Sequence, residues 1–155
     1  MTATTTEKQP QIATFTTAAT YRGNLRTDVS ARQFHIGVAE PNDLGGDDSA
    51  PNPMELLLAG LDGCLAVVAD VVAAEYGAKI NALSLETEAD LDLRGFLGTA
   101  QVQPYFQAVR TKIDIDIDLS SEKFNEYTEE VLRRCPAATL ILAAKVQFEI
   151  VWRQI

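Results

Sequence analysis

The spacing of apolar residues changes along the chain, and each change predicts a different element. Residues 12–22, 26–31 and 32–39 alternate β-branched or aromatic residues with polar ones, which is typical of short strands. A Gly-Asn pair between the first two fits a tight turn. Glycine, proline, asparagine and aspartate then gather in residues 40–53, which predicts a surface loop. The first third of the chain is therefore expected to be a three-stranded antiparallel meander followed by a loop.

A long apolar helix is predicted over residues 53–76. Asn52 can cap it, Pro53 suits its first position, and Glu55 lies in the first turn, where the helix dipole favours a carboxylate. The helix is apolar on nearly every face, so we expect it to be buried on nearly all sides. One chain of this length has few elements left to enclose it, which predicts a homodimer.

The second half of the chain returns to strand periodicity in residues 83–95 and 109–120. Ile113, Ile115 and Ile117 alternate with Asp114, Asp116 and Asp118, which places isoleucines on one face and carboxylates on the other. Carboxylates at this spacing can hold a metal ion, but they more often form the solvated face of a sheet. We therefore expect these three aspartates to form the solvated face of a sheet.

Two further helices and a closing strand complete the pattern. Ser120 can cap an amphipathic helix over residues 121–135, Pro136 starts a short helix, and residues 145–152 predict the last strand. The order of three strands, a helix, two strands, two helices and a strand predicts an α+β fold, because regular βαβ alternation is absent.

Composition narrows the class of protein. A chain of 155 residues predicts a single domain, taken here as residues 12–155 after a flexible tail over 1–11. The net charge of -9 predicts that nucleic acid is not a partner. Asp62 and Asp70 interrupt the apolar helix, and we expect no membrane span. Without a pattern resembling a secretory signal, the expected location is the cytoplasm.

Cys64 and Cys135 are the candidate chemistry. His35 is the only histidine and lies in a predicted strand, which argues against an ordinary zinc site or a Ser-His arrangement and leaves it without a role. Cys135 directly precedes Pro136, so it is expected at a helix N-terminus that stabilises a thiolate. Cys64 lies inside the long helix, where burial raises a thiol pKa, so it needs a neighbouring cation to react.

The motif NPMELLLAGLDGC, together with the later segment RRCPAATLILAAKVQFEIVW, resembles the OsmC/Ohr family of peroxide-reducing proteins over about residues 20–153. The specificity lies in the combination, since each motif alone is weak. The resemblance implies an OsmC-like fold in which antiparallel sheets wrap long central helices in an intertwined homodimer. It implies no cofactor.

The same resemblance implies the roles of the site residues. Cys64 would attack a hydroperoxide and become a sulfenic acid, and Cys135 would resolve it as a disulfide that an external dithiol, of lipoyl type or a small thiol, reduces. An arginine from the N-terminal strands would activate Cys64, with Arg26 favoured over Arg32, and Glu55 would hold that arginine.

The chain departs from the family pattern after the Asn-Pro pair. Peroxidase members commonly carry glutamate at the next position, where this chain has Met54, and its carboxylate comes one residue later at Glu55. In an unbroken helix Glu55 lies about 180° from Cys64 and about 13 Å along the axis. Glu55 can then take part only if the helix breaks near Gly60 or a partner chain brings it across. The alternative function is a non-catalytic dimer that binds a small molecule or senses redox state.

Overall fold

The computed structural model describes residues 9–155, which divide into two compact units. The first unit ends at Pro53, and the second spans Met54–Ile155. Each unit is described by itself. The single domain over residues 12–155 stays a prediction, and most of the predicted tail lies outside the described residues.

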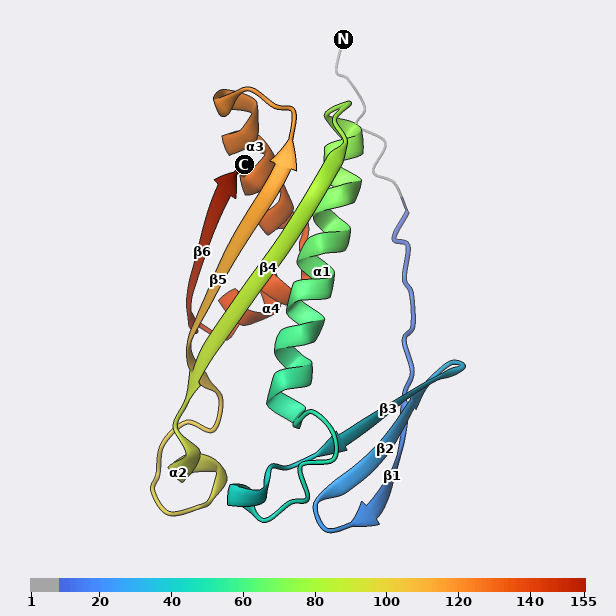
Figure 1. The fold of residues 1–155 in the computed structure, drawn as a ribbon, viewed down its shortest axis with the longest axis vertical. Coiled ribbons are helices and arrows are strands. Elements are labelled where there is room, and N and C mark those ends of the chain that lie inside the picture. The colour runs from blue at the N-terminus through green and yellow to red at the C-terminus, as the bar shows by residue number, and fades with distance from the viewer. Residues whose placement is uncertain (1–8) are drawn as a thin grey trace. The chain divides into compact units, whose positions relative to one another are not determined.

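The first unit is the predicted antiparallel meander. Its strands are β1 (Ala18–Gly23), β2 (Arg26–Ala31) and β3 (Phe34–Ala39), paired in the order β1-β2-β3 (Figure 1). The first strand begins six residues later than the expected start at residue 12. A short 3₁₀ helix, η1 (Asn42–Leu44), follows the meander.

The loop after β3 is tied to the meander by backbone hydrogen bonds. Ala39 N donates to Pro51 O at 3.2 Å, and Asp48 N donates to Glu40 O at 3.1 Å. Gly46 lies so close to Glu40 that a Cβ on it would be 1.8 Å from that carbonyl oxygen, so only glycine fits there. The predicted surface loop is therefore a constrained structure.

The second unit is a three-stranded sheet with its helices on one face (Figure 1). The long helix α1 (Pro53–Glu75) leads into it. The remaining elements are β4 (Ile80–Leu91), α2 (Leu93–Phe96), β5 (Phe106–Ile117), α3 (Ser121–Arg134), α4 (Pro136–Ala143) and β6 (Gln147–Gln154).

The α+β class predicted from the sequence is confirmed, and the predicted elements occur in the expected order. The structure adds η1 and α2, and the prediction of strand through residue 95 is wrong because β4 ends at Leu91 and α2 begins at Leu93. Ser120 caps α3, its Oγ accepting from Lys123 N at 3.5 Å. The expectation of purely antiparallel sheets holds for the meander but is wrong for the second sheet, where β4 and β5 are antiparallel and β5 and β6 are parallel. The parallel pair arises because α3 and α4 carry the chain back before β6 begins.

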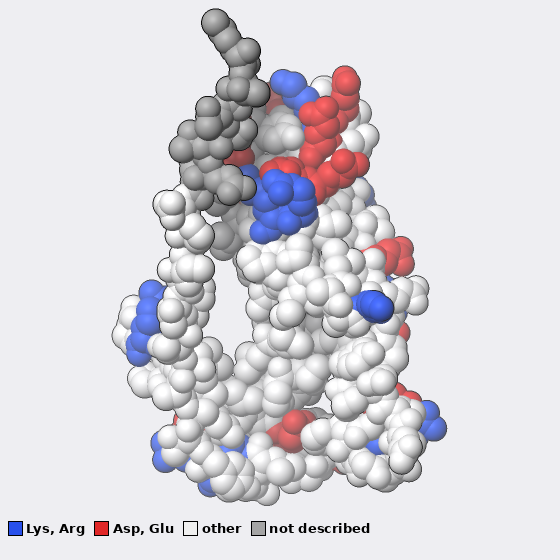
Figure 2. Space-filling model, turned by 180° about the vertical axis from the view of Figure 1, so that it is seen from behind, with Lys and Arg blue, Asp and Glu red and all other residues white. Residues whose placement is uncertain are grey.

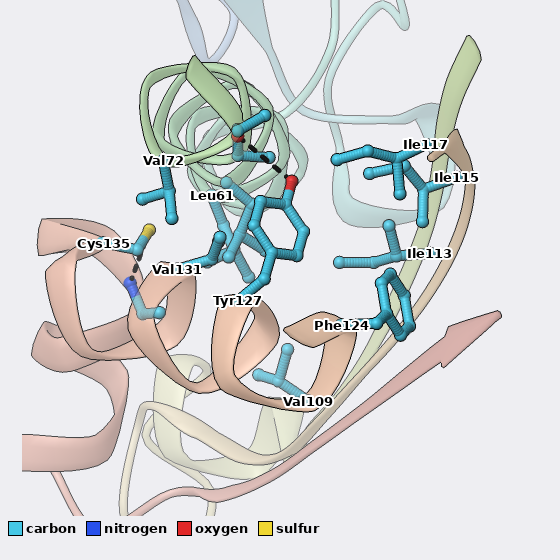
Figure 3. Packing of buried hydrophobic residues seen from close by; sticks show 14 of the residues in the cluster. Leu61, Val72, Val109, Ile113, Ile115, Ile117, Phe124, Tyr127, Val131 and Cys135 are labelled. Carbon is cyan, nitrogen blue, oxygen red and sulfur yellow. Dashed lines mark hydrogen bonds between the residues drawn. The ribbon is translucent and has the colours of Figure 1, made fainter. Parts of the chain in front are cut away.

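The core of the second unit lies between the helices and the sheet. Ile113, Ile115 and Ile117 are at most 3% exposed, as the alternating pattern predicts. Tyr127 of α3 is fully buried at the centre of the cluster, and its hydroxyl donates to the carbonyl oxygen of Ala69 in α1 at 3.1 Å (Figure 3). The outer face of the sheet is charged, and Asp114 pairs there with Arg153. This pairing agrees with the solvated-face interpretation of the aspartates.

Burial of α1 differs from the expectation. The residues of α1 that the core buries lie on one face of the helix: Leu61, Leu65, Ala69, Val72 and Ala73. Large apolar side chains on the opposite face are exposed. They are Leu57, Val67 and Val71. The prediction of burial on nearly all sides is thus wrong for the single chain, because the sheet, α3 and α4 cover only one side.

The hydropathy of α1 also differs from the expectation. By length and composition alone α1 is apolar enough to cross a membrane, since its most apolar 18-residue window has a mean hydropathy of 2.1. The expectation that Asp62 and Asp70 make it too polar is therefore wrong. A core helix meets the same criterion, and one face of α1 packs in the core.

Candidate active site

Two free thiols from distant parts of the sequence meet in the second unit. Cys64 lies in the middle of α1, and Cys135 lies in the break between α3 and α4. Their sulfur atoms are 3.3 Å apart, with the Cys135 thiol as hydrogen-bond donor. A disulfide bond is about 2.05 Å long, so a small movement of the two side chains would join them. The pairing implied by the family resemblance is thus geometrically available.

Cys135 is the N-cap of α4, as its position before Pro136 predicts. Ala138 N donates to its sulfur at 3.5 Å (Figure 3). The expectation that this site stabilises a thiolate is nevertheless wrong. Burial, opposed by the hydrogen bond from Ala138 and reinforced by Cys64, raises the pKa of Cys135 to about 11. Desolvation outweighs the helix terminus because the side chain is fully enclosed.

Cys64 is the accessible member of the pair. It is half-buried, whereas Cys135 has no exposed surface. Because Cys135 stays protonated at neutral pH, its thiol can donate a hydrogen bond to a Cys64 thiolate. The pair thus combines one partly accessible thiol with one enclosed thiol that stays protonated at neutral pH.

The other residues predicted for the site belong to other elements of the chain. Glu55 is in the first turn of α1, which continues through Gly60 without a break, so the predicted alternative of a broken helix is wrong. Arg26 and Arg32 belong to the first unit, at the start of β2 and in the turn before β3. Within residues 54–155 the structure gives Cys64 no arginine or lysine partner. The roles assigned to Glu55, Arg26 and Arg32 therefore stay predictions.

A polar contact anchors α1 to the sheet, and the sequence pattern did not predict it. Thr87 of β4 donates to the carboxylate of Asp62 at 2.5 Å and shares a second hydrogen bond with Thr111 at 2.9 Å. Thr111 is only 1% exposed. The bonds hold Asp62 toward the sheet. Threonines are common in strands, so nothing in their spacing marks this contact.

An apolar pocket of about 200 Å³ opens between α1, α4 and the start of β5. Leu57, Leu61 and Phe106 are among the residues that line it, whereas Leu65 belongs to the core. Ala137, two residues after Cys135, also contributes to the lining. The pocket thus shares both helices with the thiol pair. Arg94 takes no part in it and pairs with Asp92 at 2.6 Å in the turn around α2.

The described residues form no candidate metal site. Among residues 9–155, no group of three or more histidine, cysteine, aspartate and glutamate side chains is placed to hold a metal ion. The chemistry available is that of two adjacent thiols, one half-buried and one enclosed, together with an apolar pocket lined by residues of the same two helices.

Comparison with known proteins identifies the family. The model of the OsmC-like protein family matches residues 46–151, and the chain belongs to this family. No curated protein sequence matches significantly.

Solved structures share the fold. An OsmC-like protein from Mycoplasma pneumoniae has a TM-score of 0.77 at 19% identity, covering 94% of this chain and 98% of that one. An organic hydroperoxide resistance protein OsmC from Legionella pneumophila has a TM-score of 0.71 at 20% identity, covering 94% and 100%. An organic hydroperoxide resistance protein from Elizabethkingia anophelis has a TM-score of 0.72 at 18% identity, covering 95% and 100%.

Proposed function

We propose that this protein is a thiol-dependent peroxidase that reduces organic hydroperoxides in preference to inorganic ones. The observation that carries the proposal is the 3.3 Å contact between a half-buried Cys64 and an enclosed Cys135. An inert pair of core cysteines does not need one thiol at the surface and the other at a helix N-cap. The family and the names of two structural relatives point to the same chemistry.

The first step is attack by the Cys64 thiolate on the terminal oxygen of the hydroperoxide. The O–O bond breaks, an S–O bond forms, and the departing alkoxide takes a proton to become an alcohol. Cys64 is oxidised to a sulfenic acid, and the peroxide is reduced by two electrons. The adjacent pocket supports an apolar substituent on the substrate, because its lining is almost entirely hydrocarbon.

The second step joins the two cysteines. The Cys135 sulfur attacks the sulfenic sulfur of Cys64, the thiol proton leaves with the hydroxyl as water, and a disulfide forms. An external dithiol, of lipoyl type or a small thiol, then reduces this disulfide through a mixed disulfide and is itself oxidised. A reducing compartment such as the cytoplasm would supply such thiols.

The working form proposed here is a homodimer that pairs α1 with its copy. The uncovered side of α1 carries a stripe at alternating spacings of three and four residues, the periodicity of helix-pairing seams. Its members are Leu57, Gly60, Cys64, Val67 and Val71. A Cβ built on Gly60 would meet nothing within 4 Å, so a second helix has room to approach.

Activation of Cys64 is assigned to an arginine of the first unit, Arg26 in preference to Arg32. Both cations carry the charge that a thiolate needs. Arg26 is held by side-chain contacts, whereas Arg32 is exposed and lies 5.0 Å from the ring centroid of Phe34. Glu55 remains a proposed partner of the arginine in the dimer.

Consumption of cumene hydroperoxide with a dithiol reductant tests the reaction. Cys64→Ser is expected to abolish turnover, and Cys135→Ser to allow one oxidation but no disulfide, seen as a sulfenic acid trapped by dimedone. His35→Ala, a substitution outside the proposed site, serves as the control. Undiminished turnover in Cys64→Ser would contradict the proposal and leave the small-molecule-binding or redox-sensing alternative.

A further inference from the structure

The helix-covered face of the second sheet carries a polar pair between apolar ones. Thr87 of β4 and Thr111 of β5 are cross-strand partners. Residues two positions along a strand share its face, and the neighbouring pairs on this face are Leu85–Ile113 and Ala89–Val109. Thr111 is only 1% exposed, so its hydroxyl needs a hydrogen-bond partner within the protein. The threonine pair therefore marks one specific place on a surface that is apolar around it.

Asp62 of α1 is the helix group that meets this pair. Thr87 Oγ1 donates to Asp62 Oδ1 at 2.5 Å and lies 2.9 Å from Thr111 Oγ1. A hydroxyl has one proton, so Thr87 accepts from Thr111 while it donates to the carboxylate. The three groups thus form a chain of hydrogen bonds that ends on a carboxylate, an acceptor that binds more strongly than a neutral one.

Hydrocarbon packing alone does not select one rotation of α1 about its axis. Leu65 and Val72 lie on the face that the core buries, whereas Leu57 and Val71 lie on the uncovered face. The two faces offer the same types of side chain, so burying one instead of the other gains a similar transfer free energy. A buried polar group that pairs in only one arrangement can fix the register of a helix, as it does in coiled coils. Asp62 is such a group.

Two other polar contacts of α1 are less selective. Tyr127 donates to the carbonyl oxygen of Ala69, and every turn of a helix presents carbonyl oxygens of this kind. Glu75 pairs with Arg134 at 2.6 Å, but it is the last residue of the helix and both side chains are partly exposed. Exposed ion pairs contribute little to stability. The contact at Asp62 is therefore the one that distinguishes one rotation of α1 from another.

The rotation of α1 decides whether the two thiols touch. In an ideal helix Asp62 and Cys64 lie about 160° apart around the axis, so a helix held to the sheet by Asp62 presents Cys64 on its other flank. An atom at the surface of a helix lies about 5–6 Å from the axis, and a rotation of about 40° moves it by about 4 Å. Such a movement would break the contact between the sulfurs of Cys64 and Cys135, which are 3.3 Å apart.

We infer that Asp62, Thr87 and Thr111 are positioning residues that hold α1 in the rotation at which Cys64 meets Cys135. The reduced chain is then already arranged for the disulfide, so closing the bond requires little further ordering. The inference deepens the proposed function, and it rests on that function only in giving the disulfide a part in turnover.

Equilibrium with dithiothreitol tests the inference, because oxidised dithiothreitol takes up the two electrons and two protons that the thiols release as the disulfide forms. Thr87→Val removes the donor to Asp62, keeps a similar side-chain shape and changes no charge. It is expected to lower the equilibrium constant for the Cys64–Cys135 disulfide about 10-fold, because the released helix must be ordered each time the bond closes. Thr87→Ser restores the hydroxyl and should return the constant to the wild-type value. Thr111→Val leaves the bond to Asp62 in place and should give a smaller decrease.

Ile115→Val is the matched control. Ile115 lies on the same face of β5 as Thr111 and is fully buried, and the substitution trims the core without removing a hydrogen bond. It should lower the free energy of unfolding of the reduced and the oxidised protein alike, which leaves the disulfide constant unchanged. A purely structural role for Thr87 predicts this same result for Thr87→Val.

The inference is overturned if Thr87→Val leaves the constant unchanged, if Ile115→Val lowers it equally, or if Thr87→Ser does not restore it. Should Thr87→Val fail to fold, an unchanged constant in Thr111→Val overturns the inference. The equilibrium involves no peroxide. A lowered constant together with an active Cys64→Ser enzyme would keep the positioning residues and reject the peroxidase. An unchanged constant together with inactive Cys64→Ser would reject the positioning residues and keep the peroxidase.

Discussion

The two faces of α1 have similar residue types but opposite surroundings. Leu65 and Val72 face the sheet and are at most 1% exposed, whereas Val67 and Val71 on the other face are 65% and 46% exposed. Seen from the side opposite to Figure 1, charged side chains gather toward the end where α1 stops, and the area directly below this cluster is mostly uncharged (Figure 2). Apolar composition therefore does not decide which residues of this helix are buried. Burial is decided by the elements that pack against each face.

Cys64 and Asp62 show what each face contributes. Asp62 is turned to the sheet and held by Thr87, which fixes the rotation of the helix about its axis. Cys64 belongs to the uncovered stripe but still reaches Cys135 from its edge. The inner face thus supports the fold, while the border between the faces holds the thiol pair.

The largest expected effect is on the inner face. Leu65→Ala should lower the free energy of unfolding by about 2–5 kcal/mol, because it leaves a cavity in the core. Val67→Ala on the uncovered face should change it by less than about 0.5 kcal/mol under dilute conditions where the chain is monomeric. Urea denaturation followed by circular dichroism measures both. Equal losses would mean that the two faces do not differ as described.

A charge on the uncovered face tests the proposed dimer. Val67→Asp should weaken self-association by about 2 kcal/mol, or about 30-fold, because a carboxylate would have to be buried without a partner. Sedimentation equilibrium measures the dissociation constant. Val151→Asp, which places the same charge at a half-exposed valine of β6, should leave association unchanged. An unaffected Val67→Asp dimer would place the interface elsewhere.

A smaller effect is expected at the hydrogen bond between α3 and α1. Tyr127→Phe removes the donor to the Ala69 carbonyl and should cost about 1 kcal/mol of unfolding free energy. Burial raises the pKa of Tyr127 to about 12, so the hydroxyl remains a donor through the neutral range. Thermal unfolding at neutral pH measures the loss. Tyr105→Phe, at a tyrosine that is 45% exposed, is the control and should unfold like the wild type.

The smallest effect on stability at neutral pH is expected at Cys135, and this effect becomes larger only at alkaline pH. Its pKa is raised to about 11 in the folded chain, so the unfolded chain loses this proton first as pH rises. The contribution of Cys135 to stability is complete below its ordinary thiol pKa and declines as pH rises toward about 11. Denaturation of the reduced protein between pH 8 and about 11 should show this slope. Cys135→Ala should flatten it, and an equal slope in both proteins would contradict the assignment.

Most elements were predictable because their patterns are local. Alternating isoleucines and aspartates predicted β5, the Pro53 start predicted α1, and Cys135 before Pro136 predicted the N-cap of α4. The hydrogen bonds from Arg26 to Ser49 and from Ser49 to Asp47 were not predictable. The first of them joins a strand to a loop across 23 residues of sequence. The parallel placement of β6 was also missed, since strand direction depends on the path of the preceding helices rather than on the strand's own residues.

The sequence pattern was sufficient to predict the α+β class, the order of the main elements and the family. Periodicity, helix caps and each of the two cysteine motifs depend on residues that are close together in the chain. Tertiary structure decided the contact between Cys64 and Cys135 and the relative character of the two thiols. The cap position alone suggested that Cys135 is the easier thiolate. Its complete burial instead raises its pKa, because desolvation depends on everything that packs around a side chain and not on its neighbours in the chain.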